Sequence, residues 1–447
     1  MVKTQYQEGQ LGLFRPTSEW RLPTELPDLR GRPIVAIDTE GKDDGLKRGL
    51  GPGWALGMNQ VYGVSWAAEG TKGYAPMRHP ETANFPVENV LRWVDDLFKS
   101  GTRVVFHNGP YDVGGLGSEG VSTPVLMEDT SAAAVMLDEN HRSYSLDACL
   151  EREGLPLKSK HTLTEAVKAY GGKPDKPAAW IYLLPAKYVG EYGEDDAART
   201  LDLWNLYEPR LREDGVWDAY RLEMDLIPVV VAMRRRGIRI DVDRAEQVAA
   251  AFRKRVSVIL DLATDRLSHV TGGRRVTIED LRSPQWLARA FTAESLKFPR
   301  TPKSGQGSFS KDWMEKSEHW LPRLVVEARH YEDAASKQVE NFLLSYVHRG
   351  RIHAEVHQFK TDDGGTRSQR FSYSSPPLQQ MQGVEEGPDD KPAPDCSLCR
   401  RFELPRCRGG GTSLSRESSH GLPPDGRRHD RETTEAIQDP QSGHDVW

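Results

Sequence analysis

Residues 34–40 have the sequence IVAIDTE, and this short stretch decides the fold class. Its first four residues are apolar and mostly β-branched, which predicts a buried strand over Ile34–Ile37 that ends at Asp38. Side chains two residues apart on a strand point to the same side, so the Asp38 and Glu40 carboxylates can share a cation. An acidic pair after a strand is, however, more often a solvated turn or a helix cap.

Strand and helix patterns alternate after this stretch. Residues Val61–Ala67 and Thr71–Pro76 have the composition of strands, and the second ends at a proline. Apolar residues recur at helical spacing between Pro86 and Lys99, and Arg103–His107 follows as a buried strand. The alternation predicts an α/β domain with helices packed on a mixed sheet, and the strand ends are the natural place for a site.

Two further stretches carry acids at notable positions. Asp112 follows the predicted strand in the sequence HNGPYD (107–112). Tyr192 and Asp196 lie four residues apart in a stretch that has helical character, so they project from one helix face. Taken singly, the first stretch is typical of an ordinary turn and the second of a solvated acidic helix face.

Together the three stretches resemble the DEDD exonuclease family, in its tyrosine-containing branch. The matching positions are Asp38 and Glu40 in the first motif, Asp112 at its spacing from Asn108 in the second, and Tyr192 with Asp196 in the third. Each motif is only moderately specific, but all three occur in the family's order and on the expected element types. The resemblance implies a ribonuclease H-like fold and a metal-dependent 3′–5′ exonuclease.

Phosphodiester hydrolysis explains why such residues are needed. Its transition state places extra charge on phosphate oxygens, which two divalent ions about 3.5–4 Å apart can stabilise. Mg²⁺ prefers carboxylate oxygens, and cations offset the repulsion between clustered acids. The resemblance implies two Mg²⁺ (or Mn²⁺) ions, the first held by Asp38, Glu40 and Asp196. Asp38 also contacts the second ion, and Asp112 acts through water. Tyr192 and Glu40 are implied to orient the attacking water.

A second resemblance, to family A DNA polymerases such as DNA polymerase I, covers about residues 32–381. It rests on MRRRGIRID (233–241), GRIH (350–353) and the stretch 366–381, which departs from the family pattern at Pro377. The residues implied to contact DNA are Asn108, Gln358, Arg370 and Gln379. Each of the last three could equally be an ordinary polar residue of a surface loop.

The predicted organisation has five parts. They are a lead-in (1–31), a ribonuclease H-like exonuclease domain (32–212), a mostly α-helical thumb-like domain (213–349), the beginning of a palm (350–381) and a low-order tail (382–447). The periodic spacing of apolar residues is lost at residue 382, and no match to the catalytic carboxylates of a polymerase palm follows. We therefore expect an out-of-frame tail, or a split gene whose partner is a separate polymerase fragment. An alternative for the tail is a zinc knuckle formed by Cys396, Cys399, Cys407 and His420.

Composition restricts the function classes further. The 447 residues carry a net charge of −6 and only four cysteines, so neither a global basic field nor a disulfide framework is present. No apolar run is long enough for a membrane span, and we expect a cytoplasmic enzyme. The predicted function is removal of nucleotides from DNA 3′ ends, with a single-stranded end or a primer-template as partner. The alternatives are an RNase D-like RNA-trimming exonuclease and a non-catalytic DNA-binding fragment.

Overall fold

The computed structural model describes residues 15–362 and 364–381. The described residues all belong to one compact unit of the chain. The tail predicted from residue 382 onward, with its candidate zinc ligands, lies outside the described residues. Within the described ranges, no helix is both long and apolar enough to cross a membrane.

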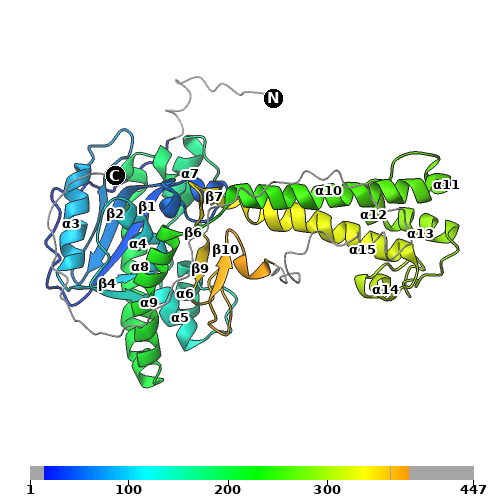
Figure 1. The fold of residues 1–447 in the computed structure, drawn as a ribbon. Coiled ribbons are helices and arrows are strands. Elements are labelled where there is room, and N and C mark those ends of the chain that lie inside the picture. Colours follow the sequence, from blue (N-terminus) through cyan, green and yellow to red (C-terminus); the bar gives the residue numbers. More distant parts are fainter. Residues whose placement is uncertain (1–14, 363, 382–447) are drawn as a thin grey trace, which may run out of the picture. The chain divides into compact units, whose positions relative to one another are not determined.

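A five-stranded mixed sheet forms the centre of the first part of the chain (Figure 1). The strand order is β3-β2-β1-β4-β5, in which β1 pairs antiparallel with β2 and parallel with β4. The elements are β1 (Val35–Asp43), α2 (Asp44–Lys47), η2 (Gly53–Leu56), β2 (Asn59–Ala68), β3 (Thr71–Pro76), α3 (Val87–Lys99), β4 (Arg103–Phe106), α4 (Gly109–Ser118), β5 (Leu126–Asp129), α5 (Thr130–Leu137), α6 (Leu146–Glu153), α7 (His161–Ala169), η3 (Pro177–Leu183), η4 (Ala186–Tyr188), α8 (Gly190–Glu213) and α9 (Trp217–Arg236). The predicted mixed α/β class is confirmed.

Helices α3 and α8 cover opposite faces of this sheet. Neighbouring residues of a strand point to opposite faces, and Trp66 and Ser65 of β2 separate in this way. The Trp66 ring packs against Trp93 of α3, with the ring centroids 5.3 Å apart. Ser65 instead lies beside Gly193 of α8, on the face toward which Asp38 also points. The sheet is therefore buried on both sides, and its polar residues are turned toward α8.

Strand β1 is longer than the sequence pattern predicted. The expected end at Asp38 is wrong, because β1 continues to Asp43 through pairing with β2, as far as Asp43 opposite Asn59. The pairing register shifts between Glu40 and Gly41. Such bulges bend a strand and re-aim its side chains, and this one follows directly after the acidic pair.

Helix α9 belongs to the same hydrophobic core as the sheet. Tyr220, Met224 and Ile227 are almost completely buried, and they share one core cluster with Ile37 of β1. Sequence reasoning placed this helix at the start of the second domain, beyond residue 212. The shared core shows that α9 packs as part of the α/β layer structure.

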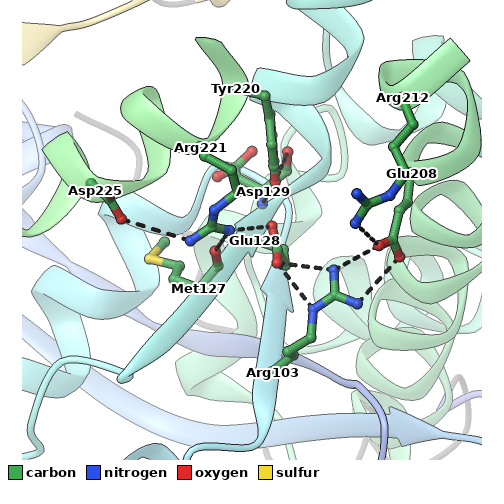
Figure 2. Close-up of polar contacts among 9 residues, drawn as sticks. All are labelled: Arg103, Met127, Glu128, Asp129, Glu208, Arg212, Tyr220, Arg221 and Asp225. Atoms are coloured by element: carbon green, nitrogen blue, oxygen red, sulfur yellow. Dashed lines mark hydrogen bonds and ion pairs between the residues drawn. The ribbon is translucent and has the colours of Figure 1, made fainter. Parts of the chain in front are cut away.

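Buried ion pairs tie α9 to the sheet as well (Figure 2). The Glu128 carboxylate on β5 is 3.0 Å from Arg221 of α9 and 3.0 Å from Arg103 of β4. Arg103 is also 3.1 Å from Glu208 of α8. Glu128 thus links β5 to β4 and α9, and Arg103 extends this network to α8.

The remaining described residues are mainly helical. Their elements are β6 (Ile238–Arg239), α10 (Val242–Arg266), α11 (Ser268–Thr271), α12 (Ile278–Arg282), α13 (Pro284–Ala293), α14 (Lys311–Lys316), α15 (Trp320–Asp333), the π-helix η5 (Ala334–Asn341), η6 (Leu344–Tyr346), β7 (Val347–His348), β8 (Arg351–Ile352), β9 (Glu355–His357), β10 (Ser372–Ser374) and η7 (Leu378–Gln380). Helices α10 and α15 pack along each other (Figure 1). Asp241 caps α10, because its carboxylate accepts the Arg244 N–H at 2.9 Å.

Candidate active site

Three carboxylates from two distant stretches meet beside the sheet. Asp38, Glu40 and Asp196 each offer an oxygen atom, and these three oxygens all lie within 4.8 Å of one another. Asp38 and Glu40 come from β1, and Asp196 comes from α8. The donor set contains only hard oxygen ligands, as Mg²⁺ and Mn²⁺ prefer, and its spacing suits a shared cation.

Helix α8 delivers the third motif to this point. Tyr192 and Asp196 are separated by about one helical turn, and both are buried on the face toward the sheet. The close approach depends on Gly193, where an added Cβ atom would lie 3.0 Å from the Tyr74 ring of β3. A side chain at position 193 would crowd the Tyr74 ring, which would have to shift by a few tenths of an ångström.

Asp112 reaches the site from the first turn of α4. Its Oδ1 accepts hydrogen bonds from the backbone N–H and the hydroxyl group of Thr39, at 2.9 and 2.6 Å. Thr39 lies between the two acids of β1, so this contact fixes Asp112 beside them. Taken singly, this stretch was typical of an ordinary turn, but it forms a short helix with Pro110 in its first turn.

The buried Asp129 carboxylate at the end of β5 holds the start of α4 in place. It accepts the Gly109 N–H at 2.6 Å and also caps α5 through the N–H groups of Ser131 and Ala132, at 2.7 and 3.0 Å. The Asp129 N–H in turn donates to the Tyr220 hydroxyl of α9 at 2.8 Å. This single side chain therefore positions two helices that line the site.

A pocket of about 330 Å³ encloses the whole constellation. Its lining residues are Asp38, Thr39, Glu40, His107, Asn108, Tyr111, Asp112, Ser131, Tyr144, Ser145, Leu146, Lys158, Tyr192, Asp196, Thr361 and Asp362. All five residues predicted for catalysis and the predicted DNA contact Asn108 are among them. The pocket also includes two residues from a distant part of the chain, Thr361 and Asp362.

Burial and mutual repulsion disfavour charge on these acids. Burial raises the pKa of Asp38 well above its ordinary value, and the nearby Asp196, Glu40 and Asp112 carboxylates raise it further. The pKa of Glu40 is raised for the same reasons, and burial raises the pKa of Asp112 to about 7. A cluster in which each acid raises its neighbour's pKa needs a positive charge to be stable in its ionised form.

The pocket also contains a positively charged residue, Lys158, that the sequence analysis did not identify. Lys158 lies between α6 and α7, and its Nζ atom is 2.5 Å from Asp196 Oδ1 and 3.1 Å from the Tyr192 hydroxyl. Its side chain is only 11% exposed. Burial opposes the charge of Lys158, but the Asp196 carboxylate outweighs burial and raises the pKa of the ammonium group.

The other predicted DNA contacts lie outside this pocket. Gln358 is 4% exposed, and its amide donates to the Glu223 side chain at 3.0 Å and to the Glu223 carbonyl at 3.1 Å. Arg370 and Gln379 are exposed, and the Gln379 amide group bonds to the backbone of Phe371 and Tyr373, at strand β10. DNA contact by these three residues stays a prediction.

Comparison with known proteins identifies the relatives of this chain. No family model matches it. A DNA-directed DNA polymerase from Pseudomonas phage M6 is 31% identical over 386 residues, which is 83% of this chain and 56% of the relative. The chain is homologous to DNA polymerases. DNA polymerase DpoZ from Acinetobacter phage SH-Ab 15497 is 26% identical, over 79% of this chain and 57% of the relative. DNA polymerase I from Chloroflexus aurantiacus is also 26% identical, over 85% of this chain and 40% of the relative.

A solved structure extends the DNA polymerase relationship to the fold. The POL domain of Pol1 from M. smegmatis, in complex with DNA primer-template and dNTP, matches with a TM-score of 0.57 at 19% identity. The match covers 80% of this chain and 54% of that structure. This DNA polymerase homologue thus spans about half the length of the polymerases it matches.

Proposed function

We propose that the chain is a metal-dependent 3′–5′ exonuclease with a ribonuclease H-like exonuclease fold, which removes nucleotides from DNA 3′ ends. The observation that carries the proposal is the convergence of Asp38, Glu40 and Asp196 within 4.8 Å. Asp112 and Tyr192 line the same pocket, and they complete the five positions of the exonuclease motifs. The homology to DNA polymerases supports DNA as the substrate.

The residues present fit two divalent ions. The carboxylates are buried, close together and raised in pKa, so they gain most from added positive charge. When bound, Mg²⁺ or Mn²⁺ would stabilise the charge that develops on the attacking and leaving oxygens of the phosphodiester. Asp38, Glu40 and Asp196 would hold the ions, with Asp112 acting from α4.

Protein groups orient the reacting molecules. The Tyr192 hydroxyl oxygen accepts a hydrogen bond from Lys158, and the hydroxyl in turn donates to the Asp196 carboxylate, which opposes the increase of the Asp196 pKa that burial causes. We propose that Tyr192 and Glu40 orient the attacking water. The pocket has a volume of about 330 Å³ and is lined by residues of α4, α6 and α8, and we propose that it takes an unpaired strand end.

Release of mononucleotides from a 3′-labelled single-stranded DNA with Mg²⁺ tests the proposal. Asp38→Ala should abolish release, because it removes a carboxylate from the centre of the cluster. Asp195→Ala is the matched control: Asp195 is adjacent to Asp196 but pairs with Lys72 at 3.0 Å, outside the pocket lining. Equal activity of Asp38→Ala and the wild type would refute the proposal.

The same assay separates the two alternatives. Preferred cleavage of an RNA strand of the same sequence would favour an RNA-trimming exonuclease. Binding of DNA without release of nucleotides at any Mg²⁺ or Mn²⁺ concentration would favour a non-catalytic DNA-binding fragment.

Polymerisation by this chain needs its own test. The relatives are named DNA polymerases, but the sequence predicts that these 447 residues lack the carboxylates for nucleotide addition. We therefore predict no primer extension by the purified chain with all four dNTPs, under conditions in which nucleotides are released.

A further inference from the structure

The Lys158 ammonium occupies a place where a divalent ion would also bind. Its Nζ lies 2.5 Å from Asp196 Oδ1, and that carboxylate is one of three whose oxygens lie within 4.8 Å of one another. The side chains of Lys158 and Asp196 are 11% and 7% exposed. This contact is a buried salt bridge, because both charged groups are largely shielded from water. The charge of each group is therefore stabilised mainly by the other.

The charges of the pocket explain why a cation is held there. Four carboxylates converge, from Asp38, Glu40, Asp112 and Asp196, and burial disfavours the charge on each. Lys158 supplies one positive charge against up to four negative ones. Without it, Asp196 would be a buried acid with like charges as its nearest neighbours, a situation that is strongly unfavourable.

We propose that Lys158 is a resident, exchangeable cation of the nuclease centre that competes with divalent ions for Asp196 and thereby sets the metal concentration the enzyme requires. This inference rests on the proposed function, because it assigns Asp196 to metal binding. Lys158 acts here as a positioning residue. It keeps Asp196 and Tyr192 in place at low metal concentration and yields Asp196 when metal is plentiful.

A second acceptor for the ammonium group lies close by. Asp147, in the first turn of α6, contributes to the raised pKa of Lys158. One Asp147 oxygen pairs with Lys160, whereas the other, Oδ1, is buried without a hydrogen-bond partner. A lysine side chain with four flexible carbons can turn from Asp196 toward Asp147.

Mn²⁺ binding to the full chain, measured by calorimetry, distinguishes competition from simple support of the fold. If Lys158 competes, Lys158→Met should lower the Mn²⁺ Kd by about tenfold, because one positive charge leaves the cluster. The Mn²⁺ concentration for half-maximal nucleotide release should fall in parallel. A residue that only supported Asp196 structurally would raise the Kd when removed.

Two further variants serve as controls. Lys158→Arg keeps the charge and should leave the Kd within about threefold of the wild type. Lys99→Met removes an equal charge from α3, on the other face of the sheet, from a side chain that is 60% exposed and paired with Asp95, and should leave the Kd unchanged. Lys158→Gln replaces Lys158→Met if circular dichroism shows that the latter does not fold.

The outcomes separate this inference from the proposed function. If the wild type binds Mn²⁺ and releases nucleotides, an unchanged or higher Kd in Lys158→Met overturns the competition alone. If the wild type neither binds Mn²⁺ nor releases nucleotides, the proposed function fails, and the competition fails with it.

Discussion

A single hydroxyl group distinguishes Tyr192 from a phenylalanine, and we propose that this group acts in the reaction. The ring is buried, and the hydroxyl oxygen lies 3.1 Å from Lys158 Nζ. If Tyr192 orients the attacking water, Tyr192→Phe should slow single-turnover release of nucleotides roughly 10²-fold. Mn²⁺ affinity should stay within about twofold, because carboxylates are the ligands that hard cations prefer. Equal losses of rate and of metal affinity would contradict this role.

Residues differ in how far the sequence predicted them. Strand alternation predicted only that Asp38 and Glu40 share a side, and helical spacing only that Tyr192 and Asp196 share a helix face. Their assignment to one site came from the resemblance to the exonuclease motifs. Lys158 could not be predicted in this way, because it lies in a charged stretch without periodicity, and only tertiary contact with Asp196 gives it a role.

Among the ion pairs that join helices and strands, those of the buried Glu128 carboxylate should contribute more to the free energy of unfolding than those of exposed acids nearby. It joins Arg103 and Arg221, and its side chain is 3% exposed (Figure 2). Glu128→Gln would remove the negative charge that the two arginines share. Both arginines are more than a quarter exposed and keep a second acidic partner, so we expect the free energy of unfolding to fall by about 1.5 kcal/mol.

The matched control lies in the same network. Asp225 is 3.7 Å from Arg221, but its side chain is 75% exposed. Asp225→Asn should change the free energy of unfolding by no more than about 0.5 kcal/mol. Urea denaturation of both variants measures the two changes. Similar losses of unfolding free energy would show that the buried Glu128 carboxylate stabilises the fold no more than the exposed Asp225 carboxylate.

A buried histidine ties the segment after β3 to the end of η3. The Nδ1 atom of His79 lies 2.7 Å from the Leu184 carbonyl oxygen, and Nε2 lies 2.7 Å from the Tyr74 hydroxyl. A carbonyl only accepts, so Nδ1 carries the proton and the neutral Nε2 accepts from Tyr74. Burial lowers the pKa of His79 from 6.5 to about 4.

This shift predicts a pH dependence of stability. The pKa of the folded state lies below that of the unfolded state, so the stabilisation is complete above pH 6.5 and is lost as the pH falls toward 4. From pH 7 to pH 5, His79 should lower the free energy of unfolding by about 2 kcal/mol. His79→Gln keeps one donor and one acceptor but does not titrate. Urea denaturation at both pH values should show a smaller loss for the variant, and equal losses would exclude His79 as the cause.

The sequence predicted some elements well and missed others for clear physical reasons. Strand β3 has the predicted bounds Thr71–Pro76. Helix α4 was not expected, because four glycines and a proline among its ten residues give it poor helix propensity. Burial of Val113 and Leu116 in the core outweighs that weakness. Tertiary contacts of this kind cannot be seen in a local sequence window.

For the whole molecule, the hydrophobic core crosses the domain boundary that the sequence suggested. The predicted exonuclease domain ends at residue 212, but α9 begins at Trp217 and its apolar face lies in the same core. The pocket likewise includes Thr361 and Asp362, and Asp362 accepts the Tyr144 N–H at 2.7 Å. The change from an alternating strand-and-helix pattern to a purely helical one therefore marked a change of element type. It did not mark the edge of the hydrophobic core.

Two fragments of the chain test how much α9 contributes. Tyr220, Met224 and Ile227 are at most 2% exposed, and each side chain buried in this way stabilises a fold by about 1.5–3 kcal/mol. A fragment of residues 15–237 should therefore be more stable than one of residues 15–212 by about 5 kcal/mol or more. The shorter fragment also loses the hydrogen bond between Tyr220 and Asp129, which holds the start of α4. The urea midpoints of the two fragments measure this difference. Because α9 shares its core with Ile37, we expect the shorter fragment to unfold at a lower urea concentration. Equal midpoints would mean that the sheet and α8 form a sufficient core without α9.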